Sequence, residues 1–190
     1  MSETTYYSVL KSLIGDLVLI SNGEALTGLL MSTHKDEIAG SQEWRRDDRL
    51  LSTVRDQLEE YFAGERTDFD VPFAVKGTEF QKRAWMELRR IPYGETISYS
   101  EQARRMGKPA AVRAVGSANG RNMISIIIPC HRVIGADGSL TGFGGGIERK
   151  RALLELEAQG LKRAGDRMSR KSTTSAEIKR AAQYCSPSIP

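Results

Sequence analysis

A thiol, an imidazole and a guanidinium occupy three consecutive positions, Cys130, His131 and Arg132. They follow the apolar residues 126–128 and Pro129, a pattern typical of a buried strand that ends in a loop. The two basic neighbours are expected to favour the thiolate of Cys130, because an unperturbed thiol has a pKa of about 8.5. A lone cysteine in an apolar run is more often a small buried hydrophobe, but its polar neighbours here favour a nucleophile.

Direct pairing of Cys130 with His131 requires a change in backbone direction. Adjacent side chains of a strand point to opposite faces, so the two groups can meet only if the chain turns after Pro129 or if a water lies between them. The run therefore predicts a turn, or a bridging water, at an activated cysteine.

The first part of the chain, residues 1–76, predicts a small α/β domain. Short apolar runs at 6–10, 15–20 and 25–30 predict an antiparallel sheet, with a hairpin turn at Asn22 and Gly23. Apolar residues then recur at helical spacing from 43 to 62, and Gly64 follows as a stop. No motif in this domain indicates chemistry, so we expect it to act as a scaffold.

The second part, residues 77–160, predicts a mostly helical domain. Capping patterns at 78–81 and 98–101 mark two helix starts, and Gly107-Lys108-Pro109 separates the second helix from another over 109–118. Two short helices joined in this way predict a helix-turn-helix with Arg113 on its recognition helix. Any helical hairpin gives the same spacing, so the motif alone is weak.

Two more segments follow the cysteine. Residues 135–146 hold six glycines, which indicates a loop whose backbone can approach a flat ligand closely. A helix is expected over 148–158, with Gly160 as its stop. Residues 161–190 show no periodicity and predict a flexible or loosely attached tail, in which Cys185 is an incidental thiol.

Charge is distributed unevenly over these parts. Residues 1–75 hold seven Lys and Arg against 14 Asp and Glu, residues 76–160 hold 14 against eight, and residues 161–190 hold seven against two. A basic segment beside an acidic one fits a DNA-facing domain next to one that does not contact DNA, although many basic segments are simply solvated.

Composition excludes several classes. The chain lacks an apolar run of about 20 residues and a secretory signal, so we expect a cytoplasmic protein. Two cysteines make no disulfide framework, and with His34 and His131 as its only histidines the chain has no metal-ligand spacing. We expect neither a metal nor a cofactor.

Three motifs carry a resemblance to a known family. Residues 129–133 (Pro-Cys-His-Arg-Val), 113–116 (Arg-Ala-Val-Gly) and 91–96 (Ile-Pro-Tyr-Gly-Glu-Thr) resemble, in order and spacing, the signature of O6-alkylguanine-DNA alkyltransferases. The likeness continues through the glycine-rich loop and Lys150 to residues 153–157. The resemblance is dense over residues 77–160, loose over residues 1–76 and absent from residues 161–190. It implies DNA repair by irreversible transfer of an alkyl group from guanine to Cys130, once per molecule.

The resemblance also implies roles for residues around the cysteine. His131 would take the Cys130 proton through a water, Glu157 would orient the imidazole from the end of the last helix, and Asn122 would hold the loop. Tyr99 would donate a proton to the leaving base and crowd the DNA backbone. Pocket residues would be Pro129, Val133, Phe143 and Gly144; Phe143 stands where many relatives have tyrosine, and Met123 where they usually have proline.

On DNA, the resemblance implies that Arg113 enters the base stack while the damaged nucleotide is flipped out, with Ala114 and Gly116 beside it. A phosphate contact is the commoner role for such an arginine. The partner would be double-stranded DNA that contains O6-alkylguanine, bound by a monomer. Repair of O4-alkylthymine and cooperative binding along DNA stay open.

Three other functions compete with this one. A lesion-binding relative without a nucleophile is disfavoured by Cys130. A sequence-specific regulator would need polar base-reading residues, whereas the recognition helix carries mostly alanine and valine. A cysteine hydrolase would turn over repeatedly, and an alkyl acceptor would react once.

Overall fold

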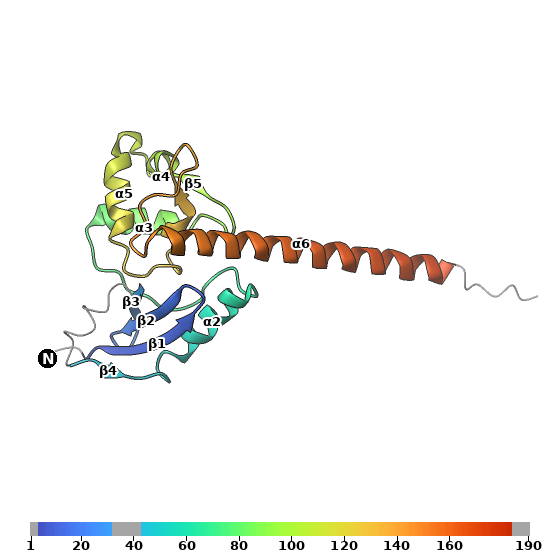
Figure 1. Cartoon of the computed structure of the whole chain (residues 1–190), viewed down its shortest axis with the longest axis horizontal. Coiled ribbons are helices and arrows are strands. Elements are labelled where there is room, and N and C mark those ends of the chain that lie inside the picture. Colours follow the sequence, from blue (N-terminus) through green and yellow to red (C-terminus); the bar gives the residue numbers. More distant parts are fainter. Residues whose placement is uncertain (1–3, 32–42, 184–190) are drawn as a thin grey trace, which may run out of the picture.

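The computed structural model describes residues 4–31 and 43–183, the stretch 166–183 by its backbone alone. Figure 1 shows two parts, a sheet with one helix below and a helical part above, and a long last helix that extends beyond both. His34 and Cys185 lie outside the residues described here. Within the described residues, no helix is long and apolar enough to cross a membrane.

The first part is built on a four-stranded sheet in the order β3-β2-β1-β4. Its strands are β1 (Tyr6–Ser12), β2 (Gly15–Ser21), β3 (Leu26–Met31) and the short β4 (Arg45–Arg46). The pairs β1·β2 and β2·β3 are antiparallel, as predicted, whereas β4 joins β1 in parallel. The Asn22 side chain accepts from the backbone N–H groups of Glu24 and Ala25, which makes the predicted turn.

Helix α2 (Ser52–Ala63) packs against this sheet and ends as predicted, because Gly64 adopts φ 74° and its N–H caps the last turn. Its predicted start at Glu43 is wrong. The chain first forms β4, and the Asp47 carboxylate then accepts from the N–H groups of Arg49 and Leu50 in a turn. Local side chain to backbone bonds thus compete with the helix there.

The second part begins with α3 (Glu79–Leu88), whose predicted capping box of Thr78 and Gln81 is present. Helix α4 (Tyr99–Arg105) starts at the Ser98 cap and ends before Gly107, which adopts φ 71°. The recognition helix differs slightly from the prediction: one 3-10 turn, η2 (Pro109–Ala111), precedes α5 (Val112–Gly120). Both α3 and α4 pack against α5.

The predicted strand over residues 126–128 is not formed. Ile126 adopts φ 74°, and Ile128 donates back to Ile124 in a turn. Burial of three isoleucines therefore explains this apolar run better than strand pairing does. The chain does turn after Pro129, as predicted, into a 3-10 helix η3 (Cys130–Arg132). Strand β6 (Val133–Ile134) follows and pairs in parallel with β5 (Ile97–Ser98).

Helix α6 (Ile147–Gln183) is much longer than expected. The prediction that Gly160 ends it is wrong. A glycine in a helix interior costs about 1 kcal/mol relative to alanine but does not forbid the helix. Gly160 is buried against Tyr93, whose hydroxyl a Cβ would strike, so the glycine allows close packing. Residues 161–183, expected to lack regular structure, are helical in backbone, and 184–190 lie outside the described residues.

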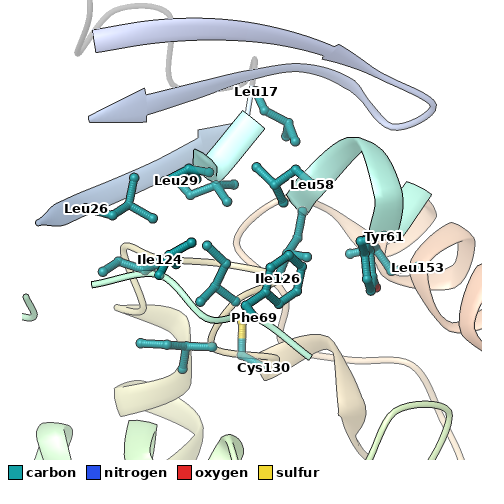
Figure 2. Close-up of a cluster of buried hydrophobic side chains, with 14 of the residues drawn as sticks. Leu17, Leu26, Leu29, Leu58, Tyr61, Phe69, Ile124, Ile126, Cys130 and Leu153 are labelled. Carbon is teal, nitrogen blue, oxygen red and sulfur yellow. The ribbon is translucent and has the colours of Figure 1, made fainter. Parts of the chain in front are cut away.

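One hydrophobic cluster joins the two parts. Leu17, Leu29 and Leu58 of the first part pack in the same cluster as Ile126 and Leu153 of the second. Figure 2 shows Cys130 on the far side of this cluster from the strands, and Tyr61 beside Leu153 of α6. The cysteine is thus held by the core that the two parts share.

Candidate active site

Asn122, which the resemblance implies holds the loop before Cys130, bonds to that loop at three points. Its amide donates to the Ile128 carbonyl at 2.7 Å and to the Cys130 sulfur at 3.3 Å, and its oxygen accepts from the Ile124 N–H at 3.0 Å. One side chain therefore joins both ends of the loop and the thiol. Cys130 is only 4% exposed, so it meets reagents through a pocket rather than on an open surface.

The expectation that His131 and Arg132 favour the thiolate is wrong for the resting protein. Burial raises the pKa of Cys130, and hydrogen bonds from Asn122 and Ser125 and the charge of Lys150 offset this only in part. The imidazole and the guanidinium point instead to Glu157. Cys130 therefore rests as a thiol, and its proton must be removed for reaction.

Glu157 is the centre of a buried charge cluster. One carboxylate oxygen lies 2.8 Å from His131 Nε2, and the Arg132 guanidinium donates to both oxygens at 2.9 to 3.2 Å. Burial raises the pKa of this carboxyl, but the hydrogen bonds and charges of His131 and Arg132 outweigh it and lower the pKa to about 2. Glu157 is therefore ionised at neutral pH.

The position of Glu157 differs from the prediction that it closes the last helix. It lies well inside α6, which continues to Gln183. Two further donors reach it that sequence reasoning missed: the hydroxyl of Tyr61 at 2.8 Å and the backbone N–H of Gly94 at 2.9 Å. Gly94 lies in the 91–96 motif, whereas no sequence signal indicates Tyr61.

His131 rests as a neutral imidazole. Burial lowers its pKa, and the hydrogen bond and charge of Glu157 counteract this only partly. With Nε2 donating to the ionised Glu157, the other ring nitrogen, Nδ1, is the acceptor. Nδ1 is buried and has no partner among the described residues. A buried acceptor of this kind fits an ordered water, which is one of the two arrangements predicted between His131 and Cys130.

A small pocket reaches the cysteine. It has a volume of about 50 Å³ and lies between the Asn122 loop, the end of β3 and the glycine-rich loop. Of the predicted pocket residues, Gly144 lines it with Cys130, whereas Pro129, Val133 and Phe143 are buried and are not among its lining residues. Met31 of β3, which sequence reasoning missed, lines it too.

The glycine-rich loop is tied down by two side chains. The Tyr99 hydroxyl donates to the carbonyls of Thr141 and Gly142 at 3.0 and 3.2 Å, and burial raises its pKa. Lys150 donates to the carbonyls of Val133 and Thr141 at 2.5 and 2.6 Å. Burial lowers the pKa of Lys150 to about 8, partly offset by Cys130. These bonds join β6, the loop and α6 next to the pocket.

The three residues that the resemblance implies at the DNA, Arg113, Ala114 and Gly116, all lie on α5. Arg113 and Ala114 are exposed on α5, and Gly116 faces the Tyr99 ring, which a Cβ would approach to 3.8 Å. A basic side chain thus extends from the helix that packs next to Tyr99. Among the described residues there is no group of three or more His, Cys, Asp or Glu side chains that could hold a metal ion.

Comparison with known proteins covers both parts of the chain. A family described as "6-O-methylguanine DNA methyltransferase, ribonuclease-like domain" matches residues 5–75. A second, "6-O-methylguanine DNA methyltransferase, DNA binding domain", matches residues 79–159. The second match includes Tyr99, Arg113, Cys130 and Glu157.

Similar proteins of other organisms match this chain over most of their own length. The methylated-DNA–protein-cysteine methyltransferase of Mycobacterium tuberculosis is 55% identical over 152 residues, which cover 80% of this chain and 92% of the relative. That of Methanosarcina acetivorans is 47% identical, with 80% and 97% covered.

Solved structures agree in fold. The crystal structure of Mycobacterium tuberculosis O6-methylguanine methyltransferase matches with a TM-score of 0.76 at 52% identity, covering 82% of this chain and 94% of that one. The structure of Mycobacterium tuberculosis OGT in complex with DNA matches with a TM-score of 0.75 at 54% identity over the same shares. With both domains matched and the buried cysteine in place, the chain belongs to the methylated-DNA–protein-cysteine methyltransferases, the O6-alkylguanine-DNA alkyltransferase family.

Proposed function

We propose that Cys130 is the cysteine onto which this DNA-repair methyltransferase transfers the alkyl group, and that the group comes from O6 of guanine in double-stranded DNA. The observation that carries the proposal is the arrangement around the thiol. Cys130 contacts Asn122, and the next residue is a neutral histidine held by an ionised glutamate. These are the nucleophile, base and orienting group that thiol activation needs.

The chemistry begins with loss of the thiol proton. A water between Cys130 and His131 Nδ1 would pass this proton to the imidazole, and Glu157 would stabilise the imidazolium that forms. The thiolate sulfur then attacks the alkyl carbon, a new S–C bond forms, and the C–O6 bond breaks with its electron pair left on guanine. A proton donated to the base by Tyr99 balances that charge. The thioether is stable, so each molecule reacts once.

Access to the pocket requires movement. A volume of about 50 Å³ holds one or two waters, far less than a purine. The side of the pocket that can yield most easily is the glycine-rich one, where Gly144 is exposed and Gly142 and Gly146 have positive φ. Since the Tyr99 hydroxyl bonds to Gly142, entry of a base would exchange that bond for one to the base.

The DNA side of the proposal rests on Arg113. Extruding a nucleotide costs a few kcal/mol, which filling the vacated space offsets in part. Arg113 is exposed on α5 and long enough to enter the stack, whereas neighbouring Ala114 leaves the helix surface free to approach the groove. All the groups named belong to one chain, so we propose that a monomer repairs one lesion.

Mass spectrometry tests the proposal directly. The protein is mixed with duplex DNA that contains one O6-methylguanine, and its intact mass and peptide masses are measured, with Cys130→Ser as the control. One methyl group per molecule on the Cys130 peptide, missing in the control, is the expected result. Methyl groups on Cys185, or lesion binding without any mass change, would contradict it.

The time course separates alkyl transfer from hydrolysis. A single-turnover acceptor gives a product amount equal to the amount of protein and then stops. Continued product formation beyond one equivalent would instead indicate a hydrolase that uses the same cysteine. The assay repeated on O4-methylthymine shows whether that lesion is also a substrate.

A further inference from the structure

The first domain reaches the charge cluster through one side chain. Tyr61 lies on α2, and its hydroxyl donates to the Glu157 oxygen at 2.8 Å, across 96 residues of chain. Both side chains are completely buried. The oxygen that accepts from Tyr61 is also the one closest to His131 Nε2. Tyr61 therefore shares an acceptor atom with the imidazole.

Packing holds the Tyr61 ring in place. It meets Phe62 and Tyr93 edge-on, with ring centroids 5.4 and 6.0 Å away, and lies 5.4 Å from the Phe69 ring. Helix α2, which carries Tyr61, is bonded to the segment that contains Phe69, because Gln57 exchanges two hydrogen bonds with the backbone of Asp70. These contacts orient the Tyr61 hydroxyl toward Glu157.

We propose that Tyr61 is a positioning residue for alkyl transfer, whose hydroxyl holds the Glu157 carboxylate and limits how strongly that carboxylate stabilises protonated His131. The inference rests on the proposed function, in which His131 accepts the Cys130 proton. The α/β domain is then more than the scaffold that its sequence predicts, since it tunes the base in the other domain.

The direction of the effect follows from electrostatics. A hydroxyl that donates to a carboxylate withdraws part of its negative charge, so less remains to stabilise an imidazolium on the same oxygen. Other charged and titratable groups face this cluster, namely Arg132 of η3, Lys150 of α6 and the Tyr93 hydroxyl. Replacement of Tyr61 by phenylalanine leaves these in place and removes a single donor.

Tyr93 provides a matched control. Its hydroxyl is also buried in the aromatic cluster, but it has no hydrogen-bond partner among the described residues. Tyr61→Phe and Tyr93→Phe therefore delete the same atom from neighbouring rings, and only the first deletion removes a bond to Glu157. A general effect of lost packing or stability would appear in both variants.

The test is NMR titration of the His131 imidazole without DNA, with the other histidine, His34, replaced by glutamine in every protein compared. We expect Tyr61→Phe to raise the pKa of His131 by about half a unit and Tyr93→Phe to leave it unchanged. As a second variant that keeps the hydroxyl, site-specific 3-fluorotyrosine at position 61 is a stronger donor and should lower the pKa. Titration curves that coincide in all these proteins would overturn the inference.

Kinetics then connect this effect to alkyl transfer. Because the base must be neutral, the acid limb of the single-turnover rate profile should move to higher pH in Tyr61→Phe by the same half unit, and not in Tyr93→Phe. An unmoved limb would overturn the role in transfer. If wild-type protein takes no methyl group on Cys130, the proposed function fails instead, and the DNA-free titration still decides whether Tyr61 tunes His131.

Discussion

Replacing Glu157 by glutamine is expected to destabilise the protein in a pH-dependent manner. The substitution keeps the size of the side chain and removes its charge. The carboxylate accepts from His131, Arg132, Tyr61 and Gly94, and is completely buried. Glutamine cannot accept all of these bonds, because one of its two terminal groups is itself a donor.

The size of the effect follows from the pKa of Glu157, which is about 2 in the folded protein against an ordinary value of 4.5. The difference corresponds to roughly 3 kcal/mol of stability at neutral pH. Because the folded pKa is the lower one, this contribution is complete above the unfolded value and is lost as pH falls from 4.5 toward 2. About 2 kcal/mol of it should be gone by pH 3.

Urea unfolding at pH 7 and pH 3 measures the contribution as a difference between wild type and Glu157→Gln. Other carboxyl groups cancel in that difference, and the penalty for leaving Arg132 without its carboxylate is the same at both pH values. Because Glu157 also raises the pKa of His131, both proteins carry His131→Asn, so that the titration of this histidine does not enter the difference. The exposed Glu155, on the same helix, supplies the control Glu155→Gln, which should change little at either pH. A difference for Glu157→Gln that is equal at pH 7 and pH 3 would refute the reasoning.

Three further predictions concern other parts of the molecule. Arg113→Ala should slow methyl transfer from duplex DNA tenfold or more, which corresponds to a loss of ~1.4 kcal/mol or more, and should leave the rate of transfer from the free base O6-methylguanine unchanged. Equal slowing on both substrates would mean that Arg113 does not act through the DNA stack. Deletion of residues 161–190, which carry seven Lys and Arg against two Asp and Glu, should reduce the salt dependence of DNA binding by about one unit of slope or more, and an unchanged slope would remove the tail from DNA binding. Met123→Pro should stabilise the protein by about 0.4–1 kcal/mol, because proline lowers the conformational entropy of the unfolded chain. The exposed Met123 accepts from the Leu29 N–H through its carbonyl, which proline also has, so the melting temperature should rise; a lower melting temperature would mean that the loop cannot adopt the φ of proline.

Local signals predicted much of the fold, because helix caps and turns depend on neighbouring residues. The capping box at Thr78 and Gln81, the end of α2 at Gly64 and the turn at Gly107 are all as expected. Errors arose where distant contacts decide. Glycine is typical of a helix end, but Gly160 packs against Tyr93 inside α6. Isoleucine is typical of strands, but Ile126 adopts a positive φ inside the shared core.

In the site, too, the sequence indicated which residues come together but not the properties that depend on distant contacts. Resemblance pointed to His131 and Glu157, and they lie 2.8 Å apart. Sequence proximity, however, predicted the wrong electrostatics for Cys130, because the charges of residues 131 and 132 are directed at Glu157 while burial raises the pKa of the thiol. Side-chain direction depends on η3, which the sequence indicates only as a turn.

The buried carboxylate of Glu157 links folding to reactivity in this protein. It accepts from the first domain through Tyr61, from the loop before β5 through Gly94, and from η3 through His131 and Arg132. A carboxylate this deeply buried stays ionised because its contacts with His131 and Arg132 outweigh desolvation, which alone would raise its pKa. Separation of the two domains would leave His131 and Arg132 in place and remove the Tyr61 hydroxyl, so more of the carboxylate charge would remain to stabilise a protonated His131. It follows that the first domain affects the proposed base through Tyr61, although every residue proposed to touch the lesion belongs to the second domain.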